Sequence, residues 1–428
     1  MKLKKTVVIH IDALRREYLS AWLLGQRFKQ NGFQVLLTSR HSTVRLLKFY
    51  TPDIFISTHA FLLKPKEWAD LVERGTKVYI NEVEGTDHEF GVSTTYPELF
   101  YDEKIDYSLF SAIFVWGEFS YNWVIKNRAV PAQRVFLNGS TRQSSLCRPN
   151  RKTDNVVVGI LSRFEIINTF DNRHPFVNLM ALDPEEAGWR WYYERCVIDS
   201  ETFSITTKLI AMLVEKGIYV SMRAHPNENL EPYKLLKEKF GDFFKIDNAY
   251  SINEWLSTVS VVVGTTSTAF TEPYVAKIPI ISTSKIQNFH YSGKDQADLI
   301  SQFDQAAYTP ESVSEMFELC TKLDLVEKSS AELDEYFNAF YSFENLVDPI
   351  ERIIEVVKYD TVVKKKSLNI NFIFANLLLV LLDALFIVKN SIINFRSLGI
   401  IKGYNYNRFF HRPSTYMNSV LKGKIELK

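Results

Sequence analysis

Residues 219–281 decide the predicted fold: they begin with YVSMRAHPNEN and end with VSVVVGTTSTAFTEPYVAKIPII. Each of these two segments starts as a strand rich in apolar and β-branched residues and then becomes polar. The first strand leads to Arg223, His225 and Pro226, and the second leads to hydroxyl side chains at 265–268. Residues 269–276 have the pattern of a helix. Because ligands of open α/β sheets bind outside the carboxyl ends of the strands, the two loops predict an anion-binding site.

Each of these signals also has an ordinary structural interpretation. A histidine before a proline is common in loops, and serine or threonine before a helix is often only an N-cap. The occurrence of both at strand ends of one α/β segment favours a shared site that contains His225, Thr266, Ser267 and Thr268.

Length and composition indicate a globular, multidomain protein. The chain has 428 residues, 46% hydrophobic and 24% charged, with a net charge of +1. This charge gives no global basic field for nucleic acid, so we expect none as a partner. Cys147, Cys196 and Cys320 show neither paired nor metal-binding spacing, which predicts a reducing compartment and no metal. The N-terminus lacks the apolar core of a signal peptide, so we expect a cytoplasmic protein.

Strands and helices alternate along most of the chain, which predicts α/β architecture with two Rossmann-like domains facing a cleft. The first domain is expected at 1–145, and a polar linker separates it from a second domain at 155–330. Residues 331–428 are expected to form a helical C-terminal extension. Strands are predicted at 5–11, 33–39, 53–58, 77–85, 112–117, 134–142, 156–162, 219–223, 243–247, 259–263 and 278–283, and helices at 14–31, 66–74, 119–127, 203–216, 230–240, 252–258 and 310–325. Residues 164–189 are expected to be a long loop, which in a compact domain is usually functional or mobile.

The C-terminal extension contains a nearly continuous apolar segment at 368–388. Its length suits a membrane span, but Asp383 within it would be costly in a bilayer. Asn369, Asn376 and Asp383 are spaced by sevens and share one helix face. We favour an interfacial helix lying on the inner membrane, with a buried core helix, a dimer helix and a true span as alternatives. The flanking basic residues suit an anionic leaflet; they are Lys364, Lys365, Lys366, Lys389 and Arg396.

An acidic strand end, NEVEG at 81–85, is the other chemical feature. Glu82 and Glu84 are two residues apart, so on a continuing strand they would point to the same face. Two neighbouring carboxylates raise the pKa of one of them, which makes a better general base. The alternative is a pair of solvated loop acids.

The order of NEVEG, RAHP and TTSTAF along the chain resembles bacterial sialyltransferases and the capsule and lipopolysaccharide Kdo transferases. The segments AIFVWGEFS and RVFLNGSTR also look like the end of the first domain in such surface-carbohydrate proteins. The resemblance covers about residues 5–330. It implies a GT-B glycosyltransferase with an acceptor domain followed by a donor domain, and a CMP-activated ulosonic acid as the donor. The acceptor would be a glycan or a lipid-linked glycan.

The resemblance also implies roles for individual residues. His225 would contact the donor phosphate and Glu84 would deprotonate the acceptor, while a retaining mechanism would use Glu165 or Asp171 as nucleophile. The donor-binding residues would be Arg163, Arg223, Pro226, Thr266, Ser267, Thr268 and Glu272.

The chemistry implied is the departure of a nucleotide phosphate, whose growing charge preorganised donors stabilise. No DxD-like pair stands at a strand end, so we expect no metal and no cofactor beyond the donor substrate. Three alternatives remain. A CDP-glycerol-type glycerophosphotransferase would normally add a Trp-His-Gly motif, which is missing, and an epimerase a Ser-Gly-Gly turn. A membrane-tethered scaffold would need no chemistry. Inversion or retention, and a homodimer, stay open.

Overall fold

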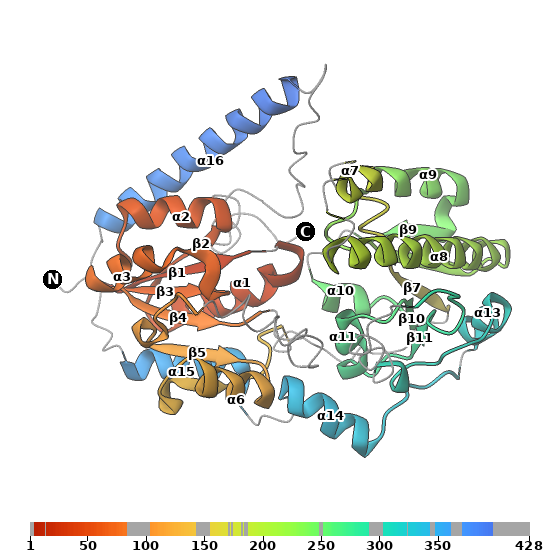
Figure 1. Cartoon of the computed structure of the whole chain (residues 1–428), viewed down its shortest axis with the longest axis horizontal. Coiled ribbons are helices and arrows are strands. Elements are labelled where there is room, and N and C mark those ends of the chain that lie inside the picture. The colour runs from red at the N-terminus through yellow and green to blue at the C-terminus, as the bar shows by residue number, and fades with distance from the viewer. Residues whose placement is uncertain are drawn as a thin grey trace. The chain divides into compact units, whose positions relative to one another are not determined.

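The computed structural model describes residues 4–12, 14–83, 103–142, 155–169, 172, 174–180, 183, 187–247, 251–290, 303–322, 324–342, 347–360 and 370–396. These residues belong to two compact units (Figure 1). The first unit combines 1–145 with 336–428, and the second comprises 146–335. Each unit is built on a parallel sheet of Rossmann type, as the alternation of strands and helices predicted.

The first unit contains a six-stranded sheet in the order β2-β1-β3-β4-β5-β6, and every neighbouring pair is parallel. Its strands are β1 (Thr6–Ile11), β2 (Gln34–Ser39), β3 (Ile54–Ser57), β4 (Lys77–Asn81), β5 (Ala112–Val115) and β6 (Val135–Leu137). Its α-helices are α1 (Leu14–Gln30), α2 (Arg40–Phe49), α3 (Pro65–Glu73), α6 (Glu118–Asn127), α15 (Pro349–Asp360) and α16 (Ile370–Arg396), with short 3₁₀ turns η1 (Ala60–Leu62), η2 (Tyr107–Leu109) and η3 (Ala132–Arg134). α2 was not predicted.

One face of this sheet forms a core with α2, α3, α6 and α16. Val8, Phe55 and Ile80 of the strands pack there with Trp68 of α3 and Leu379 of α16, all buried. α16 runs beside α2 (Figure 1). α1 contacts the strands β1 and β2 and packs against α15. The sheet is thus buried, as parallel sheets generally are.

The C-terminal helices are part of the first unit, which differs from the separate region expected at 331–428. The phenol of Tyr79 donates a hydrogen bond of 2.9 Å to Asp360, and Arg352 donates to the carbonyl oxygen of Leu137. Apolar residues of α15 and α16 are buried within a unit whose strands lie much earlier in the chain, and local sequence patterns do not reveal such long-range packing.

The position of Asp383 on α16 differs from the prediction for the polar face of this helix. Asp383 is buried and accepts a hydrogen bond of 3.2 Å from Ser42 of α2, so it faces the protein and not water. Among the described residues, no helix has both the length and the apolarity needed to cross a membrane. Asn369 and Lys364–Lys366 lie outside the described residues, and the side chains of Lys389 and Arg396 are not described either.

The second unit contains a five-stranded parallel sheet in the order β11-β10-β7-β8-β9. Its strands are β7 (Val157–Leu161), β8 (Tyr219–Arg223), β9 (Phe244–Ile246), β10 (Val261–Gly264) and β11 (Ile280–Ser282). Its helices are α7 (Pro175–Leu179), α8 (Ala187–Glu215), α9 (Glu231–Phe240), α10 (Ile252–Leu256), α11 (Thr271–Val275) and α13 (Val313–Thr321), with 3₁₀ turns η5 (Gly241–Phe243) and η6 (Thr268–Phe270). α14 (Ala331–Tyr341) contains the boundary between the two units.

The start of α8 differs from the prediction, and so does the loop expected before it. Part of the expected loop at 164–189 is helical, because it contains α7 and the start of α8. α8 begins at Ala187, well before the predicted start at 203. Its first half is rich in aromatic residues and has no clear apolar stripe. Arg195 and Asp199, one turn apart in this half, are buried and form an ion pair of 3.0 Å.

Gly159 of β7 allows the closest approach between the sheet and α10. A Cβ atom at this position would lie 2.8 Å from the indole of Trp255 and 3.0 Å from Val259. Trp255 is buried, and its indole N–H donates a hydrogen bond of 3.0 Å to Ser221 of the neighbouring strand β8. The indole therefore has little freedom to move, and a side chain at 159 has no space.

Gly159→Ala should accordingly destabilise the protein by about 1–3 kcal/mol, the usual cost of overpacking a core. Urea unfolding midpoints measure this loss. In a Trp255→Phe background the smaller ring leaves room, so the same substitution should cost clearly less there. An equal cost in both backgrounds would contradict this account of Gly159.

Candidate functional site

The candidate site of the second unit lies at the carboxyl edge of its sheet. β10, β7 and β8 are adjacent, and the loops that follow them begin at Thr265, Ser162 and Ala224. These loops contain the described candidates Arg163, Glu165, His225, Pro226, Thr266 and Ser267. The parallel topology therefore places the His-Pro loop and the hydroxyl-rich loop at one edge, on either side of the loop after β7.

His225 and Glu165 form a close polar pair at this edge. The Nδ1 atom of His225 lies 2.7 Å from a Glu165 carboxylate oxygen, and their side chains are 35% and 20% exposed. A contact this short makes Nδ1–H the donor, so the 3.3 Å approach of the Asn227 amide to the same nitrogen is not a second hydrogen bond. Nε2 is then the ring nitrogen left for a ligand.

His225 and, behind it, two arginines hold the Glu165 carboxylate in its charged form. Burial opposes ionisation of Glu165, but His225, with Arg195 and Arg163 behind it, outweighs burial and keeps the pKa well below its usual range. The guanidinium of Arg195 lies 3.6 Å from Glu165 and 3.0 Å from Asp199. Burial raises the pKa of Asp199 to about 6, although Arg195 opposes this shift.

A second carboxylate, Glu228, holds the loops after β7 and β8 together. It is buried and accepts hydrogen bonds from the Ser162 hydroxyl at 2.6 Å, the Phe164 amide at 2.5 Å and the Tyr233 phenol. Ser162 in turn accepts a bond of 3.1 Å from the His225 amide. Burial raises the pKa of Glu228. No local pattern in the sequence indicates this role, because the partners are up to 66 residues apart.

The hydroxyl-rich loop after β10 is largely occupied by internal contacts. The Thr266 hydroxyl donates to Asp304 at 2.8 Å and lies 3.1 Å from the Ser282 hydroxyl. The Thr266 carbonyl accepts a bond of 2.9 Å from Arg163. Ser267 accepts a bond of 3.2 Å from the Ala269 amide. The helix expected at 269–276 is a 3₁₀ turn, η6, followed by the short α11, so the helix dipole is smaller than expected.

Two predicted donor-binding residues are buried within the unit. Arg223 forms an ion pair with Asp247, and burial lowers the pKa of its guanidinium. Glu272 is 5% exposed, and its negative charge opposes the lowering of the Arg223 pKa. Pro226 is half-buried beside His225. Glu84 and Asp171 lie outside the described residues, and so does the side chain of Thr268.

The strand predicted at 77–85 ends earlier than expected, and the predicted pairing of Glu82 with Glu84 involves a residue outside the described part of the chain. β4 ends at Asn81, and the buried Glu82 carboxylate accepts a bond of 3.2 Å from the Trp116 amide. Its carbonyl oxygen accepts a bond of 2.7 Å from the Trp116 indole. Glu82 therefore ties the ends of β4 and β5 together.

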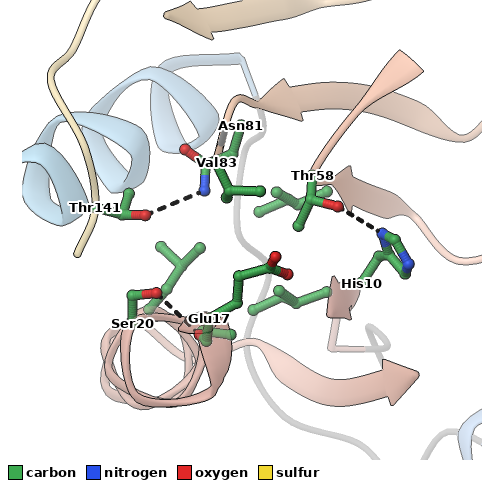
Figure 2. A pocket seen from close by; sticks show the side chains of 11 residues that line it. His10, Glu17, Ser20, Thr58, Asn81, Val83 and Thr141 are labelled. Atoms are coloured by element: carbon green, nitrogen blue, oxygen red, sulfur yellow. Dashed lines mark hydrogen bonds between the residues drawn. The ribbon is translucent and has the colours of Figure 1, made fainter. Parts of the chain in front are cut away.

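The first unit has a pocket lined by both polar and apolar side chains at the equivalent edge of its own sheet, which the sequence did not predict. Figure 2 shows Glu17 of α1, His10 of β1 and Thr58 after β3 around this pocket, with Asn81 and Thr141 on its other side. Burial raises the pKa of Glu17 to about 7, although Arg16 opposes the shift.

A cluster of metal-binding residue types lies beside this pocket. His10, Asp12 and His59 have ligand atoms within 4.8 Å of one another. The available signal was the pattern HID at the end of the first predicted strand and STH at the end of the third.

Comparisons with known proteins support the fold alone. No protein-family profile matches the sequence, and no curated protein matches it either. A histidine-to-asparagine variant of the wall teichoic acid polymerase TagF is structurally similar, with a TM-score of 0.52, 12% identity, and coverage of 84% of this chain and 89% of that chain. A histidine-to-alanine TagF variant has a TM-score of 0.50 at the same identity and coverage. Methanocaldococcus jannaschii UDP-GlcNAc 2-epimerase reaches 0.46 at 10% identity, over 83% of this chain and 100% of that chain. The chain therefore has a fold of the GT-B type, with two Rossmann-type units.

The ion pair at the candidate site predicts a pH dependence of stability. The folded-state pKa of Glu165 is depressed from its ordinary value of 4.5, so the pair stabilises the fold above that pH and the contribution is lost as the pH falls. Between about pH 6 and about pH 3, Glu165→Gln should lose less urea resistance than the wild type. Glu215→Gln, at an exposed position of α8, is the control and should follow the wild type. Parallel curves for wild type and Glu165→Gln would contradict the assignment.

Proposed function

We propose that this chain is a nucleotide-dependent transferase of the GT-B type that takes part in the assembly of a bacterial surface polysaccharide, such as a capsule or lipopolysaccharide. The donor is a nucleotide-activated sugar, for which a CMP-linked ulosonic acid is the first candidate, and the acceptor is a glycan or a lipid-linked glycan. The observation that carries this proposal is the His225–Glu165 pair at the carboxyl edge of the second sheet.

The geometry of the pair suits stabilisation of a leaving phosphate. Glu165 holds Nδ1 of His225 and thereby orients Nε2, which can donate to or protonate a phosphate oxygen when the ring is charged. Ser162 and Glu228 fix the backbone on which His225 stands. Preorganised donors of this kind stabilise charge that develops as a bond breaks. In this scheme the protein groups act without a metal or cofactor.

Several residues have roles here that differ from those predicted from the sequence. Glu165 acts as the partner that orients His225 in this proposal and not as a nucleophile, because His225 and Arg195 already bind its carboxylate. Arg223 is paired with Asp247 and thereby links the ends of β8 and β9. Arg163 and Ser267 remain as donor-binding groups. Glu84 as the acceptor base and Asp171 as a nucleophile remain predictions.

A CDP-glycerol-type glycerophosphotransferase is the second candidate. The similarity to TagF structures favours it at the level of fold, and the same His225 site would serve a departing nucleotide phosphate. The two candidates share a cytidine nucleotide and differ in what is attached to it.

Binding of nucleotides separates these candidates. A ligand at about a hundred times its Kd stabilises the folded state by about 2.7 kcal/mol. We expect CMP and a CMP-linked sugar to raise the Tm more than UDP or GDP at equal concentration. A larger shift with CDP-glycerol than with the CMP-sugar would favour the second candidate. A clear preference for UDP or GDP would contradict both, and no shift with any nucleotide would favour a scaffold.

Substitution of the site residues tests the location. His225→Ala should lower turnover by about a hundredfold, the usual loss of one strong donor to developing charge. Ser267→Ala should give a smaller loss, because its hydroxyl already interacts with the Ala269 amide. His290→Ala, at an exposed histidine of the same unit, is the matched control. Near-wild-type turnover of folded His225→Ala would remove the reaction from this edge.

We also propose a peripheral attachment to the inner membrane through α16. One face of this helix packs on the first unit through Ala375, Leu379 and Leu382. Its other face is apolar and exposed at Ile373, Phe374, Leu377, Val380, Leu381 and Leu385. An apolar outward face suits burial at the boundary of headgroups and acyl chains. Confinement to that surface would raise the effective concentration of a lipid-linked acceptor.

The attachment is tested by point substitutions, because removal of α16 would uncover the core of the first unit. Leu377→Gln, Leu381→Gln and Leu385→Gln together should reduce co-sedimentation with anionic liposomes and leave nucleotide binding unchanged. Glu351→Gln on α15 serves as a surface control. If the wild type stays in the supernatant and sediments as a dimer that the triple variant disrupts, the face is a dimer interface.

A further inference from the structure

A cluster of two histidines and one aspartate in the first unit lies at the carboxyl edge of its sheet. β1 and β3 are parallel neighbours, and both end at this edge. His10 is in β1, Asp12 follows this strand, and His59 is two residues beyond β3. The register therefore brings together residues that are 49 positions apart, and their ligand atoms lie within 4.8 Å of one another. We propose that His10, Asp12 and His59 bind a divalent transition-metal ion of the zinc type.

His10 has the outer contact that a metal-binding imidazole requires. Its ring is 1% exposed, and Nδ1 lies 3.0 Å from the Thr58 hydroxyl (Figure 2). With Nδ1 as the proton donor in this bond, the lone pair of the neutral ring is on Nε2. Metal-binding histidines are generally oriented in this way by a hydrogen bond from the other ring nitrogen.

His59 gives the strongest evidence for an ion-binding role. The side chain is 7% exposed, and its ring is stacked on Phe61 with centroids 3.6 Å apart. Within the described part of the chain, neither ring nitrogen has a hydrogen-bond partner. Nε2 lies 3.7 Å from an Asp12 oxygen, which is longer than a hydrogen bond. A buried polar nitrogen without a hydrogen bond is costly, and coordination of an ion between Nε2 and Asp12 would remove this cost for Nε2.

Asp12 gives the cluster a negative charge and an opening to solvent. Its side chain is 22% exposed, and its backbone amide donates a bond of 2.7 Å to Glu17, which holds the loop after β1. Arg40, half-exposed, pairs with Asp12 at 3.4 Å. The alternative to a metal site is therefore an ion-pair cluster of Asp12, His59 and Arg40. Arg40 can move into water, which would leave the carboxylate for an ion.

The ligand types select the class of ion. Two imidazoles and one carboxylate suit Zn²⁺, Co²⁺ or Fe²⁺, whereas Mg²⁺ and Ca²⁺ prefer oxygen ligands. Three protein ligands leave at least one position for water or for a group from the adjacent pocket, as in catalytic zinc sites. The site lies in the first unit and does not depend on the proposed donor site in the second.

Titration of the full-length, untagged protein with Zn²⁺ and Co²⁺ tests this inference, with Mg²⁺ for comparison. We expect one ion per chain, a visible absorption band for bound Co²⁺, and no comparable binding of Mg²⁺. Asp12→Asn and His59→Gln should each weaken Zn²⁺ binding by more than about a hundredfold. Thr58→Val should weaken it by about ten- to a hundredfold, as is usual for an outer-shell contact.

Two further variants separate a metal site from the ion-pair cluster. Arg40→Ala should tighten Zn²⁺ binding, because it removes a positive charge beside the ion. His290→Gln, which changes an exposed histidine of the second unit, should bind as the wild type does. Circular dichroism confirms that each variant is folded. Failure of the wild type to bind Zn²⁺ and Co²⁺, or equal binding by folded Asp12→Asn and His59→Gln, would overturn the proposal and leave only the ion pair.

Discussion

Parallel pairing of every described strand is the constraint on which the rest of this structure depends. A parallel strand needs a crossover connection, so each strand leaves the sheet at the same edge and each helix returns the chain to the opposite edge. The polar residues that follow strands therefore gather at one edge of each sheet. This explains why His225 and Glu165 meet in the second unit, and why His10 and His59 meet in the first.

Several buried carboxylates at these edges hold loops in place. The carboxylates of Glu228, Glu82 and Asp247 accept hydrogen bonds from backbone amides, hydroxyls or a guanidinium of neighbouring strands. A buried carboxylate is tolerated only when such partners compensate its desolvation. His225 differs from them, because it is partly exposed and only one of its ring nitrogens is used by Glu165. This asymmetry between buried supports and one accessible imidazole supports a binding role for the edge.

α16 is apolar on both its buried face and its outward face. Its buried face closes the core beside α2, and its outward face carries large apolar side chains into solvent. Asp383 lies on the buried side and bonds Ser42, so the polar residue contributes to docking and does not limit exposure of the apolar face. Large exposed apolar patches usually mark interaction surfaces, because the surfaces of monomeric soluble proteins rarely carry them.

The sequence alone determined the α/β class, the two parallel sheets and the loops at their edges, because β-branched runs, glycine stops and helix periodicity are local signals. The strand that delivers His225 and the strand before Thr266 were located correctly for this reason. Only the tertiary structure decided what these side chains contact. Arg223 forms an ion pair with Asp247, and the Thr266 hydroxyl donates a hydrogen bond to Asp304. The two C-terminal helices belong to the first unit. Such pairings join residues that are far apart in the chain and depend on burial. Local sequence patterns do not reveal which distant residues are buried together.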